Sequence, residues 1–212
     1  MDAVIDAIAR FRIVPVVVID EPGSALLLAD ALIAGGLPVM EVTFRTAAAA
    51  AVIERIAASR PDVFLGAGTV LTVEQAKTAS GAGARFIVSP GLSVPVVEYC
   101  QKEGIPVIPG VLTPTEITAA ASLGISTLKF FPAEPAGGVK YLKAVCGPFR
   151  NVKFIPTGGI DERNVQAYLA LSQVAACGGS WMVKPELIAA GRFDAITHLT
   201  AAALALAAGT AS

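Results

Sequence analysis

The sequence predicts an α/β fold, a (β/α)8 TIM barrel with an N-terminal capping helix, built from residues 1–212 as a single domain. Short apolar runs rich in β-branched residues recur roughly every 20 to 26 residues. Alanine-rich segments with helical periodicity separate these runs. A doubly wound open sheet is the alternative, but the glycine fingerprint of dinucleotide-binding sheets is absent from the sequence.

Eight runs are predicted to be strands. They are IVPVVVI from Ile13, LPVMEVTF from Leu37, VFLGAGT from Val63, RFIVSP from Arg85, IPVIPG from Ile105, TLKFFP from Thr127, VKFIPTGG from Val152 and QVAACGGS from Gln173. Most are continuously apolar, which is typical of parallel strands that helices cover on both faces.

The predicted helices carry start and stop signals. MDAVIDAIARF, at residues 1–11, is an amphipathic helix with two early aspartates. Thr72 should cap VEQAKTASGAG, and Thr113 followed by Pro114 should open TEITAAASLG. Further signals are the turn Pro22-Gly23-Ser24 before SALLLADALIAGG and the stop glycines Gly35, Gly36, Gly81, Gly83, Gly104 and Gly124.

Composition excludes several classes of partner. Lys and Arg number 16 against 17 Asp and Glu, without a basic cluster, so we expect no nucleic acid partner. The longest apolar runs are shorter than the roughly 18 residues of a membrane span, and the N-terminus lacks a basic, cleavable leader, so we expect a cytoplasmic protein. Hydrophobic residues make up 54% of the chain, a surplus that indicates a subunit interface.

Cysteine and histidine offer little chemistry. Cys100, Cys146 and Cys177 form no C-x-x-C pair, which disfavours both a disulfide framework and a thiolate metal site. His198 is the single histidine and lies in an Ala/Leu-rich terminal helix, where we expect a surface or packing role. We therefore expect no metal, and imine chemistry at a lysine would need no organic cofactor either.

Polar residues gather where the predicted strands end. Active sites of such barrels lie at the carboxyl ends of the strands. The residues at those ends are Glu41, Thr43 and Arg45; Gly68 and Thr69; Ser89 and Pro90; Lys129; Thr157, Gly158 and Gly159; and Gly178, Gly179 and Ser180. The sequence therefore predicts a single site formed by these residues.

Lys129 lies within the apolar run TLKFFP and has two interpretations. It could be a strand-end lysine whose stem covers apolar surface, or Glu41 could form a structural ion pair with Arg45 or Lys129. Alternatively, Phe130 and Phe131 wall the amine off from water, favour its neutral form, and let it form an imine with a carbonyl substrate. Buried ion pairs are poor stabilisers, which favours the catalytic interpretation, with Glu41 moving protons.

Two further groups suit an anionic substrate. Arg45 offers a planar fork for a substrate carboxylate, and the Thr69 hydroxyl is a second donor. Gly158 and Gly159, with Gly178, Gly179 and Ser180, match the barrel loops whose amides bind phosphate. Glycine pairs also serve tight turns alone, so the phosphate site is one of two interpretations.

These motifs resemble the KDPG aldolases, the class I 2-dehydro-3-deoxy-6-phosphogluconate aldolases of the Entner-Doudoroff pathway, some of which cleave 4-hydroxy-2-oxoglutarate (KHG). The resemblance covers almost the whole chain. It is carried by VPVVVI from Val14, EVTFRT from Glu41, GAGTVLT from Gly66, SPGL from Ser89, LKFFPAE from Leu128, GGVK from Gly137, PTGGI from Pro156 and GGSWMV from Gly178.

The resemblance implies that Lys129 is the Schiff-base residue and Glu41 the acid/base. It also implies that Arg45 and Thr69 bind pyruvate, that Gly158, Gly159 and Ser180 bind phosphate, and that the chain forms a homotrimer. Pro90, Phe131, Thr157 and Gly179 complete the expected substrate site. The alternatives are a preference for KHG or for the C4-epimeric galactonate, a phosphate-binding barrel isomerase, and an inactive oligomeric scaffold.

Overall fold

The computed structural model describes residues 3–209. Its strands are β1 (Ile13–Val17), β2 (Val39–Thr43), β3 (Phe64–Gly68), β4 (Phe86–Val88), β5 (Val107–Ile108), β6 (Gly110–Val111), β7 (Thr127–Phe130), β8 (Lys153–Pro156) and β9 (Cys177–Gly179). Its helices are α1 (Ala3–Phe11), α2 (Ala25–Ala34), α3 (Ala49–Ser59), α4 (Val73–Gly81), α5 (Val94–Lys102), α6 (Pro114–Ser122), α7 (Gly138–Cys146), α8 (Val165–Leu169), α9 (Pro185–Ala189) and α10 (Phe193–Ala208), with a 3-10 turn at Pro22–Ser24.

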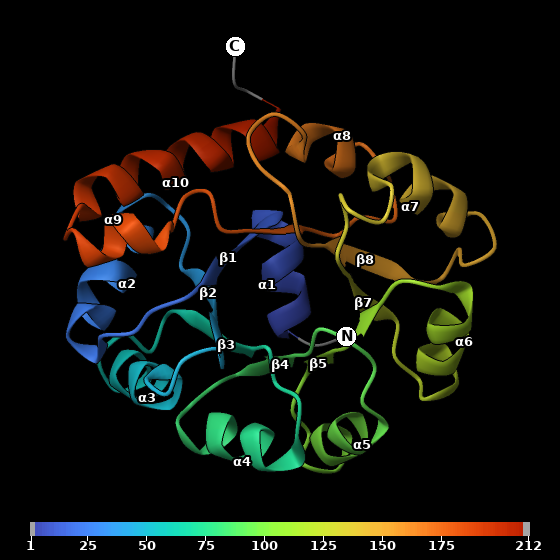
Figure 1. Ribbon diagram of the computed structural model, residues 1–212, viewed down its shortest axis with the longest axis horizontal. Helices are drawn as coiled ribbons and strands as arrows, with labels where there is room; N and C mark the ends of the chain where they lie inside the picture. Colours follow the sequence, from blue (N-terminus) through green and yellow to red (C-terminus); the bar gives the residue numbers. More distant parts are fainter. Residues whose placement is uncertain (1–2, 210–212) are drawn as a thin grey trace.

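The architecture is a curled parallel sheet with helices around its outside (Figure 1). Six strands pair in the order β5-β4-β3-β2-β1-β9, and three in the order β6-β7-β8. Parallel bridges from Phe154 to Val174 and from Thr157 to Gly178 link β8 to the segment around β9. Each predicted strand run is found, and helices alternate with them as expected.

The predicted fifth strand is divided by Pro109 into β5 and β6. A proline has no amide hydrogen to donate to a sheet. At this point the chain changes partner, because Ile108 pairs with β4 whereas Gly110 pairs with Lys129 of β7. The Pro109 carbonyl accepts a hydrogen bond from the Lys129 amide at 3.0 Å, which keeps the two segments in register with β7.

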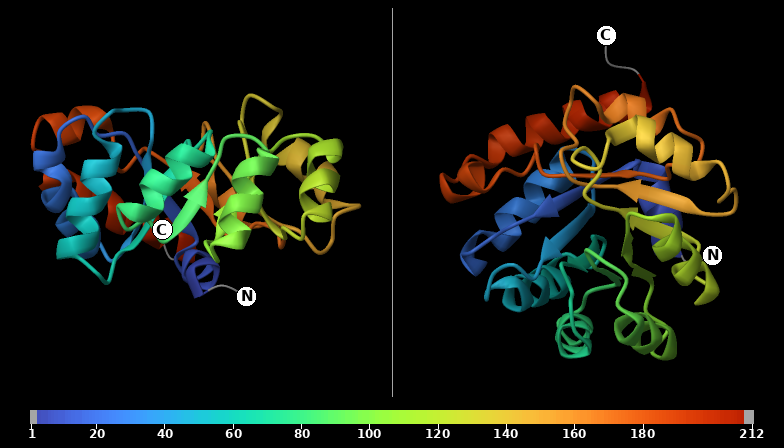
Figure 2. Two further views of the ribbon diagram at one scale, coloured as in Figure 1. Left: turned by 90° about the horizontal axis from the view of Figure 1, so that it is seen from below. Right: turned by 45° about the vertical axis from the view of Figure 1, so that its right-hand side comes forward.

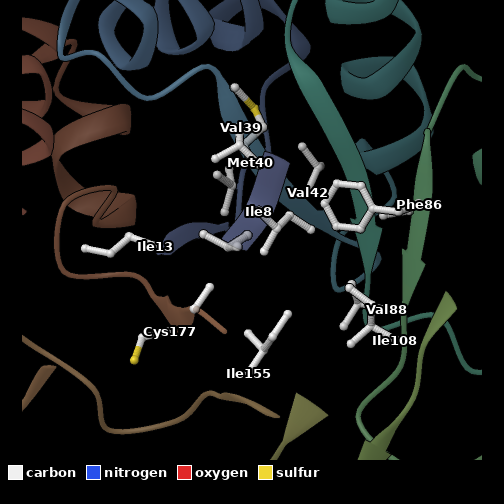
Figure 3. Close-up of a cluster of buried hydrophobic side chains, with 14 of the residues drawn as sticks. Ile8, Ile13, Val39, Met40, Val42, Phe86, Val88, Ile108, Ile155 and Cys177 are labelled. Atoms are coloured by element: carbon white, nitrogen blue, oxygen red, sulfur yellow. The ribbon is translucent and has the colours of Figure 1, made fainter. Parts of the chain in front are cut away.

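The interior of the sheet is filled by apolar side chains from several strands. Figure 3 shows Ile8 of α1 near Phe86, and both side chains line a small interior cavity. Gly66 makes room for the Phe86 ring, since a methyl group on Gly66 would lie 2.2 Å from that ring. Helix α1 lies within the ring of helices in Figure 1 and projects from one side of it in Figure 2, so its apolar face meets the interior.

The predicted helix starts are confirmed. The Thr72 hydroxyl accepts a hydrogen bond from the Gln75 amide, and Thr113 with Glu116 forms a full capping box at the start of α6. Helices α2, α5 and α6 end one or two residues before predicted stop glycines. No helix within residues 3–209 has the length and apolar character to cross a membrane.

Arg12 ties the start of β1 to the end of the chain. Its backbone has a φ of 61°, in the left-handed region, and its carbonyl accepts a hydrogen bond from the Cys177 amide. Its guanidinium donates to the carbonyls of Leu169 at 2.6 Å and Ala207 at 3.2 Å. One side chain thereby satisfies free carbonyls at the ends of both α8 and α10.

Candidate active site

Glu41 and Lys129 form a buried ion pair in the interior. Glu41 is the central residue of β2, and Lys129 lies in β7 of the other sheet. Lys129 Nζ donates to Glu41 Oε1 at 3.1 Å, and each side chain is only 5% exposed. Of the two partners predicted for Glu41 in a structural pair, Lys129 and Arg45, the structure selects Lys129.

Gly68 of β3 is what allows the Glu41 carboxylate to take this position. A methyl group on Gly68 would lie 2.0 Å from Glu41 Oε1. Glu41 and Lys129 also line a small interior cavity of about 10 Å³ together with Phe86, Val88 and Ile155. The amine and carboxylate are therefore held among apolar side chains, where electrostatic interactions are strong.

Only one of the two predicted wall aromatics faces Lys129. The Phe131 ring centroid lies 5.5 Å from Lys129 Nζ. Phe130 is fully buried and packs against Tyr141 and Phe154, with ring centroids 5.9 and 6.3 Å away. The expectation that Phe130 walls the amine is wrong, because adjacent residues of a strand point to opposite faces.

Arg45 and Thr69 lie next to each other at the mouth of the site. Arg45 Nε approaches Thr69 Oγ1 at 3.4 Å, and the Arg45 side chain is exposed. Thr69 has a φ of 57°, an uncommon conformation for a residue other than glycine, Asn or Asp. Thr43 does not join them, because its hydroxyl donates to the Val17 carbonyl at 2.8 Å and links β2 to β1.

A cavity of about 420 Å³ brings together residues from the ends of β2, β7, β8 and β9. Its lining includes the predicted residues Arg45, Phe131, Thr157, Gly158, Gly159, Gly179 and Ser180, with Val16, Val18, Ile160, Gly178 and Pro185. Val16, Val18, Ile160 and Pro185 were not predicted, since an apolar residue next to a strand end looks the same whether it lines a cavity or a core.

The loop after β8 turns its carbonyls away from this cavity. The carbonyls of Thr157 and Gly158 accept from the amides of Ala133 and Glu134 at 2.8 and 3.0 Å, and the Gly159 carbonyl accepts from Asn164 Nδ2 at 2.9 Å. Gly158 and Gly159 have φ values of 99° and 78°. Among residues 3–209, the loop hydrogen bonds leave the Gly159 amide available as a donor, whereas the parallel bridge from Thr157 to Gly178 directs the Gly158 amide toward the Gly178 carbonyl.

Gly178 and Gly179 also have packing roles. A methyl group on Gly178 would lie 2.3 Å from Thr157 Oγ1, and one on Gly179 would lie 1.8 Å from the Trp181 ring. Pro90, predicted at the site, lines neither of the two cavities containing Glu41, Lys129 or Arg45. Its carbonyl instead lies against Gly110, where a methyl group would come within 2.2 Å.

The other predicted groups lie apart from the site. His198 is exposed on α10, as expected, and the three cysteines are buried and unpaired. Burial raises the pKa of the Cys177 thiol to about 12. A separate cavity of about 400 Å³ near the amino ends of β5 and β7 has no ionisable side chain in its lining. The described part of the chain holds no group of three His, Cys, Asp or Glu side chains suited to a metal.

Comparison with known proteins places the chain among aldolases. The family model for KDPG and KHG aldolases matches residues 4–199. A 2-dehydro-3-deoxy-phosphogluconate aldolase of Treponema pallidum is 50% identical over 200 residues, which cover 94% of this chain and 95% of the relative. A KHG/KDPG aldolase of Escherichia coli K12 is 46% identical over 187 residues, or 88% of each chain.

A solved structure shows the same fold with a bound reaction intermediate. The crystal structure of KDPG aldolase from Legionella pneumophila, with pyruvate captured as a covalent carbinolamine, superposes with a TM-score of 0.92. The two sequences are 44% identical, and the alignment covers 95% of this chain and 98% of the other.

Proposed function

Because the chain belongs to the KDPG and KHG aldolase family, we propose that it cleaves 2-dehydro-3-deoxy-6-phosphogluconate (KDPG) into pyruvate and D-glyceraldehyde 3-phosphate. The observation that carries this proposal is the buried contact between Lys129 Nζ and Glu41 Oε1 in the interior of the sheet. The pair supplies an amine that can become a nucleophile and a carboxylate that can accept its proton.

The reaction begins at the amine of Lys129. Its neutral form attacks the C2 carbonyl of the substrate and gives a carbinolamine, which loses water to form a protonated imine. The positive nitrogen then withdraws electrons from the neighbouring carbons. The Phe131 ring, 5.5 Å from Nζ, covers this position and limits access of water.

Glu41 performs the proton transfers that follow. Its carboxylate takes the proton of the C4 hydroxyl as the C3–C4 bond breaks, and the electron pair of that bond moves to C3 to form an enamine. The aldehyde product leaves. The enamine is then protonated at C3, and water hydrolyses the resulting imine, releasing pyruvate and restoring the Lys129 amine.

The remaining site residues bind the two anionic ends of the substrate. Arg45 and Thr69 hold the carboxylate, near the Phe131 ring. At the other end, the phosphate lies in the cavity of about 420 Å³ lined by Gly158 and Gly159, where the Gly159 amide is available as a donor. Thr157, Gly179 and Ser180, which line the same cavity, complete the phosphate site.

We also propose that the curled sheet closes into a complete barrel. The two sheets form one closed (β/α)8 barrel, with residues 1–212 as a single domain and α1 as a cap at the amino end of the strands. Support comes from the bridges between β8 and β9, from the adjacency of β5 and β6 across Pro109, and from Ile8, which lines the small cavity beside Glu41 and Lys129. Solution scattering that fits only an open sheet would contradict it.

We further propose an oligomeric state, a compartment and a pathway for the enzyme. A homotrimer working in the cytoplasm, in the Entner-Doudoroff pathway, fits the family resemblance and the apolar composition. The three unpaired cysteines fit a reducing compartment. Light scattering measures the mass of the assembly, and a mass equal to one or two chains would overturn the trimer.

Trapping with pyruvate and borohydride tests the mechanism. Borohydride reduces an imine to a stable amine, so intact mass and peptide mapping should find one pyruvate adduct, confined to Lys129. The control is Lys143→Met, which removes an exposed lysine of α7 and should leave the adduct intact. Absence of an adduct, or adducts spread over surface lysines, would refute the imine mechanism.

Substrate preference is the second question, because the Escherichia coli relative is named for both KHG and KDPG. KHG has no phosphate and would leave the loop of Gly158 and Gly159 without the group that it binds. We therefore expect kcat/KM to be higher for KDPG than for KHG. Turnover of KDPG and its C4-epimeric galactonate, measured side by side, decides the remaining stereochemical alternative.

A further inference from the structure

The structure contains a hydrogen bond between two ionisable groups that the proposed reaction does not use. Tyr168 of α8 is fully buried, and its hydroxyl donates to Glu134 Oε1 in the segment between β7 and α7. Burial and the adjacent carboxylate both raise the pKa of the Tyr168 phenol, so it remains a donor. Glu134 itself is exposed, and the contact with Tyr168 fixes the tip of its side chain.

Glu134 contacts both glycines of the loop after β8. Its amide donates to the Gly158 carbonyl at 3.0 Å. Its side chain lies against Gly159, where a methyl group would come within 2.6 Å of Glu134 Cβ. The bond to Tyr168 therefore fixes the side chain that packs on Gly159, while the main chain of the same residue orients Gly158.

Gly138 leaves room for the contact between Glu134 and Tyr168, because it has no side chain. Its φ is 62°, and a methyl group at this position would lie 2.9 Å from Glu134 Oε1 and 3.4 Å from the Tyr168 hydroxyl oxygen. Gly138 is also the first residue of α7, and its amide donates to the Ala133 carbonyl. The segment from Ala133 to Gly138 thus folds back on itself around the contact.

We propose that Glu134 and Tyr168 are positioning residues, which hold the loop after β8 so that Gly158 and Gly159 line the cavity and the Gly159 amide binds the substrate phosphate. This rests on the proposed function, because the phosphate belongs to that substrate. Neither residue touches the reacting carbons. Their loss should weaken binding of the phosphate end and leave the chemistry at Lys129 unchanged.

The test compares four variants. Tyr168→Phe removes only the hydroxyl. Glu134→Ala removes the acceptor, and because Glu134 is exposed, this variant should still fold. Glu134→Gln keeps an oxygen that can accept from Tyr168. The matched control is Tyr141→Phe, which removes the hydrogen bond from a half-buried tyrosine to the Leu112 carbonyl at 3.1 Å, away from the glycine loop.

Binding of inorganic phosphate, measured by calorimetry, is the first readout. Tyr168→Phe and Glu134→Ala should bind phosphate about fivefold more weakly, the effect of losing one typical hydrogen bond. Glu134→Gln and Tyr141→Phe should bind it as the unchanged protein does. Equal weakening in Tyr141→Phe, or unchanged binding in both Tyr168→Phe and Glu134→Ala, would overturn the proposal.

Kinetics provide a second readout. A residue that only stabilised the fold would not raise KM while leaving kcat unchanged. KM for KDPG should rise about fivefold in Tyr168→Phe, while kcat and the rate of pyruvate trapping at Lys129 stay within about twofold. A parallel fall in trapping would mean general damage and would overturn the proposal. If the unchanged protein forms no pyruvate adduct, the proposed function fails, and the phosphate measurements still decide the role of Glu134 and Tyr168.

Discussion

Two ion pairs that join distant elements differ in geometry and in surroundings. Arg60, after α3, donates Nε and Nη2 to the two carboxylate oxygens of Asp30 in α2, at 2.6 and 2.8 Å, and the side chains are 34% and 47% exposed. Lys129 makes one contact of 3.1 Å with Glu41, and both side chains are 5% exposed. The pair with the better hydrogen bonds lies where water already solvates the charges.

This contrast separates structural from chemical use of charge. An exposed pair loses little hydration and contributes little stability. A buried pair loses most of its hydration, and a single contact recovers that loss poorly. The Glu41 and Lys129 pair is therefore explained by the reaction, in which the amine must lose a proton, better than by folding.

Removing the buried amine should have the largest effect. Lys129→Met should abolish both cleavage of KDPG and the pyruvate adduct, because no other residue in the cavity offers an amine. It should also destabilise the fold by about 3–5 kcal/mol, since Glu41 is left buried without a partner. Enzyme assay, adduct mass and urea unfolding measure these effects, and near-normal turnover would contradict the mechanism.

The double variant Glu41→Gln/Lys129→Met sharpens the comparison. It removes both charges, so its free energy of unfolding should exceed that of Lys129→Met and approach that of the unchanged protein. If the double variant is less stable than Lys129→Met, the buried pair stabilises the fold. The buried pair could then no longer be explained by the reaction alone.

Removing the buried carboxylate should come next. Glu41→Gln keeps the shape of the side chain but removes the proton acceptor, so kcat should fall by about 10²- to 10⁴-fold. The pyruvate adduct on Lys129 should still form at long times. Rapid-quench assays with KDPG, alongside borohydride trapping, measure the two steps separately, and an unchanged kcat would exclude Glu41 as the acid/base.

A displacement of the carboxylate should have a smaller effect. In Gly68→Ala the new methyl would lie 2.0 Å from Glu41 Oε1, so the carboxylate must move away from Lys129. We expect kcat to fall by about 10²-fold or less, because a misplacement of about 1 Å in a catalytic group has effects of that size. Gly81→Ala, at an exposed end of α4 with no atom near the added methyl, is the control.

The exposed pair should give the smallest effect. Its hydrogen bond from Arg60 lowers the pKa of Asp30, so its stabilisation is present above the ordinary aspartate pKa and is lost as the pH falls through the lowered value. Asp30→Asn should leave turnover unchanged and lower the unfolding temperature slightly at neutral pH. The difference should vanish once the pH lies below the lowered pKa of Asp30, where the carboxylate is protonated. A difference that grows on acidification would contradict this assignment.

Sequence patterns predicted most of the elements and the catalytic pair. Apolar runs and capping residues are local signals, which is why all eight runs and the starts at Thr72 and Thr113 are found. Glu41 and Lys129 stand out because charged residues are rare in continuously apolar strands. The division at Pro109 was missed, because a proline at an edge and one at a change of strand partner look alike in sequence.

The residues that sequence could not identify depend on contacts across the fold. Gly68 matters only because β3 brings it beside Glu41, and Tyr168 only because α8 brings it beside Glu134. The misplacement of Phe130 has a local cause, since two successive aromatics cannot face the same side of a strand. Pro90 was expected at the site from its position at a strand end, which does not fix where its ring points.

Arg12 has a consequence for how the protein is made. The first strand, β1, pairs with β9, and Arg12 binds the carbonyl of Ala207, 195 residues later in the chain. During synthesis, β1 can pair with β2 early, but its other edge remains without a partner until the segment around β9 has been made. Closure of that edge is therefore a late, long-range event, and until then the emerging chain presents an open strand to its neighbours on the ribosome.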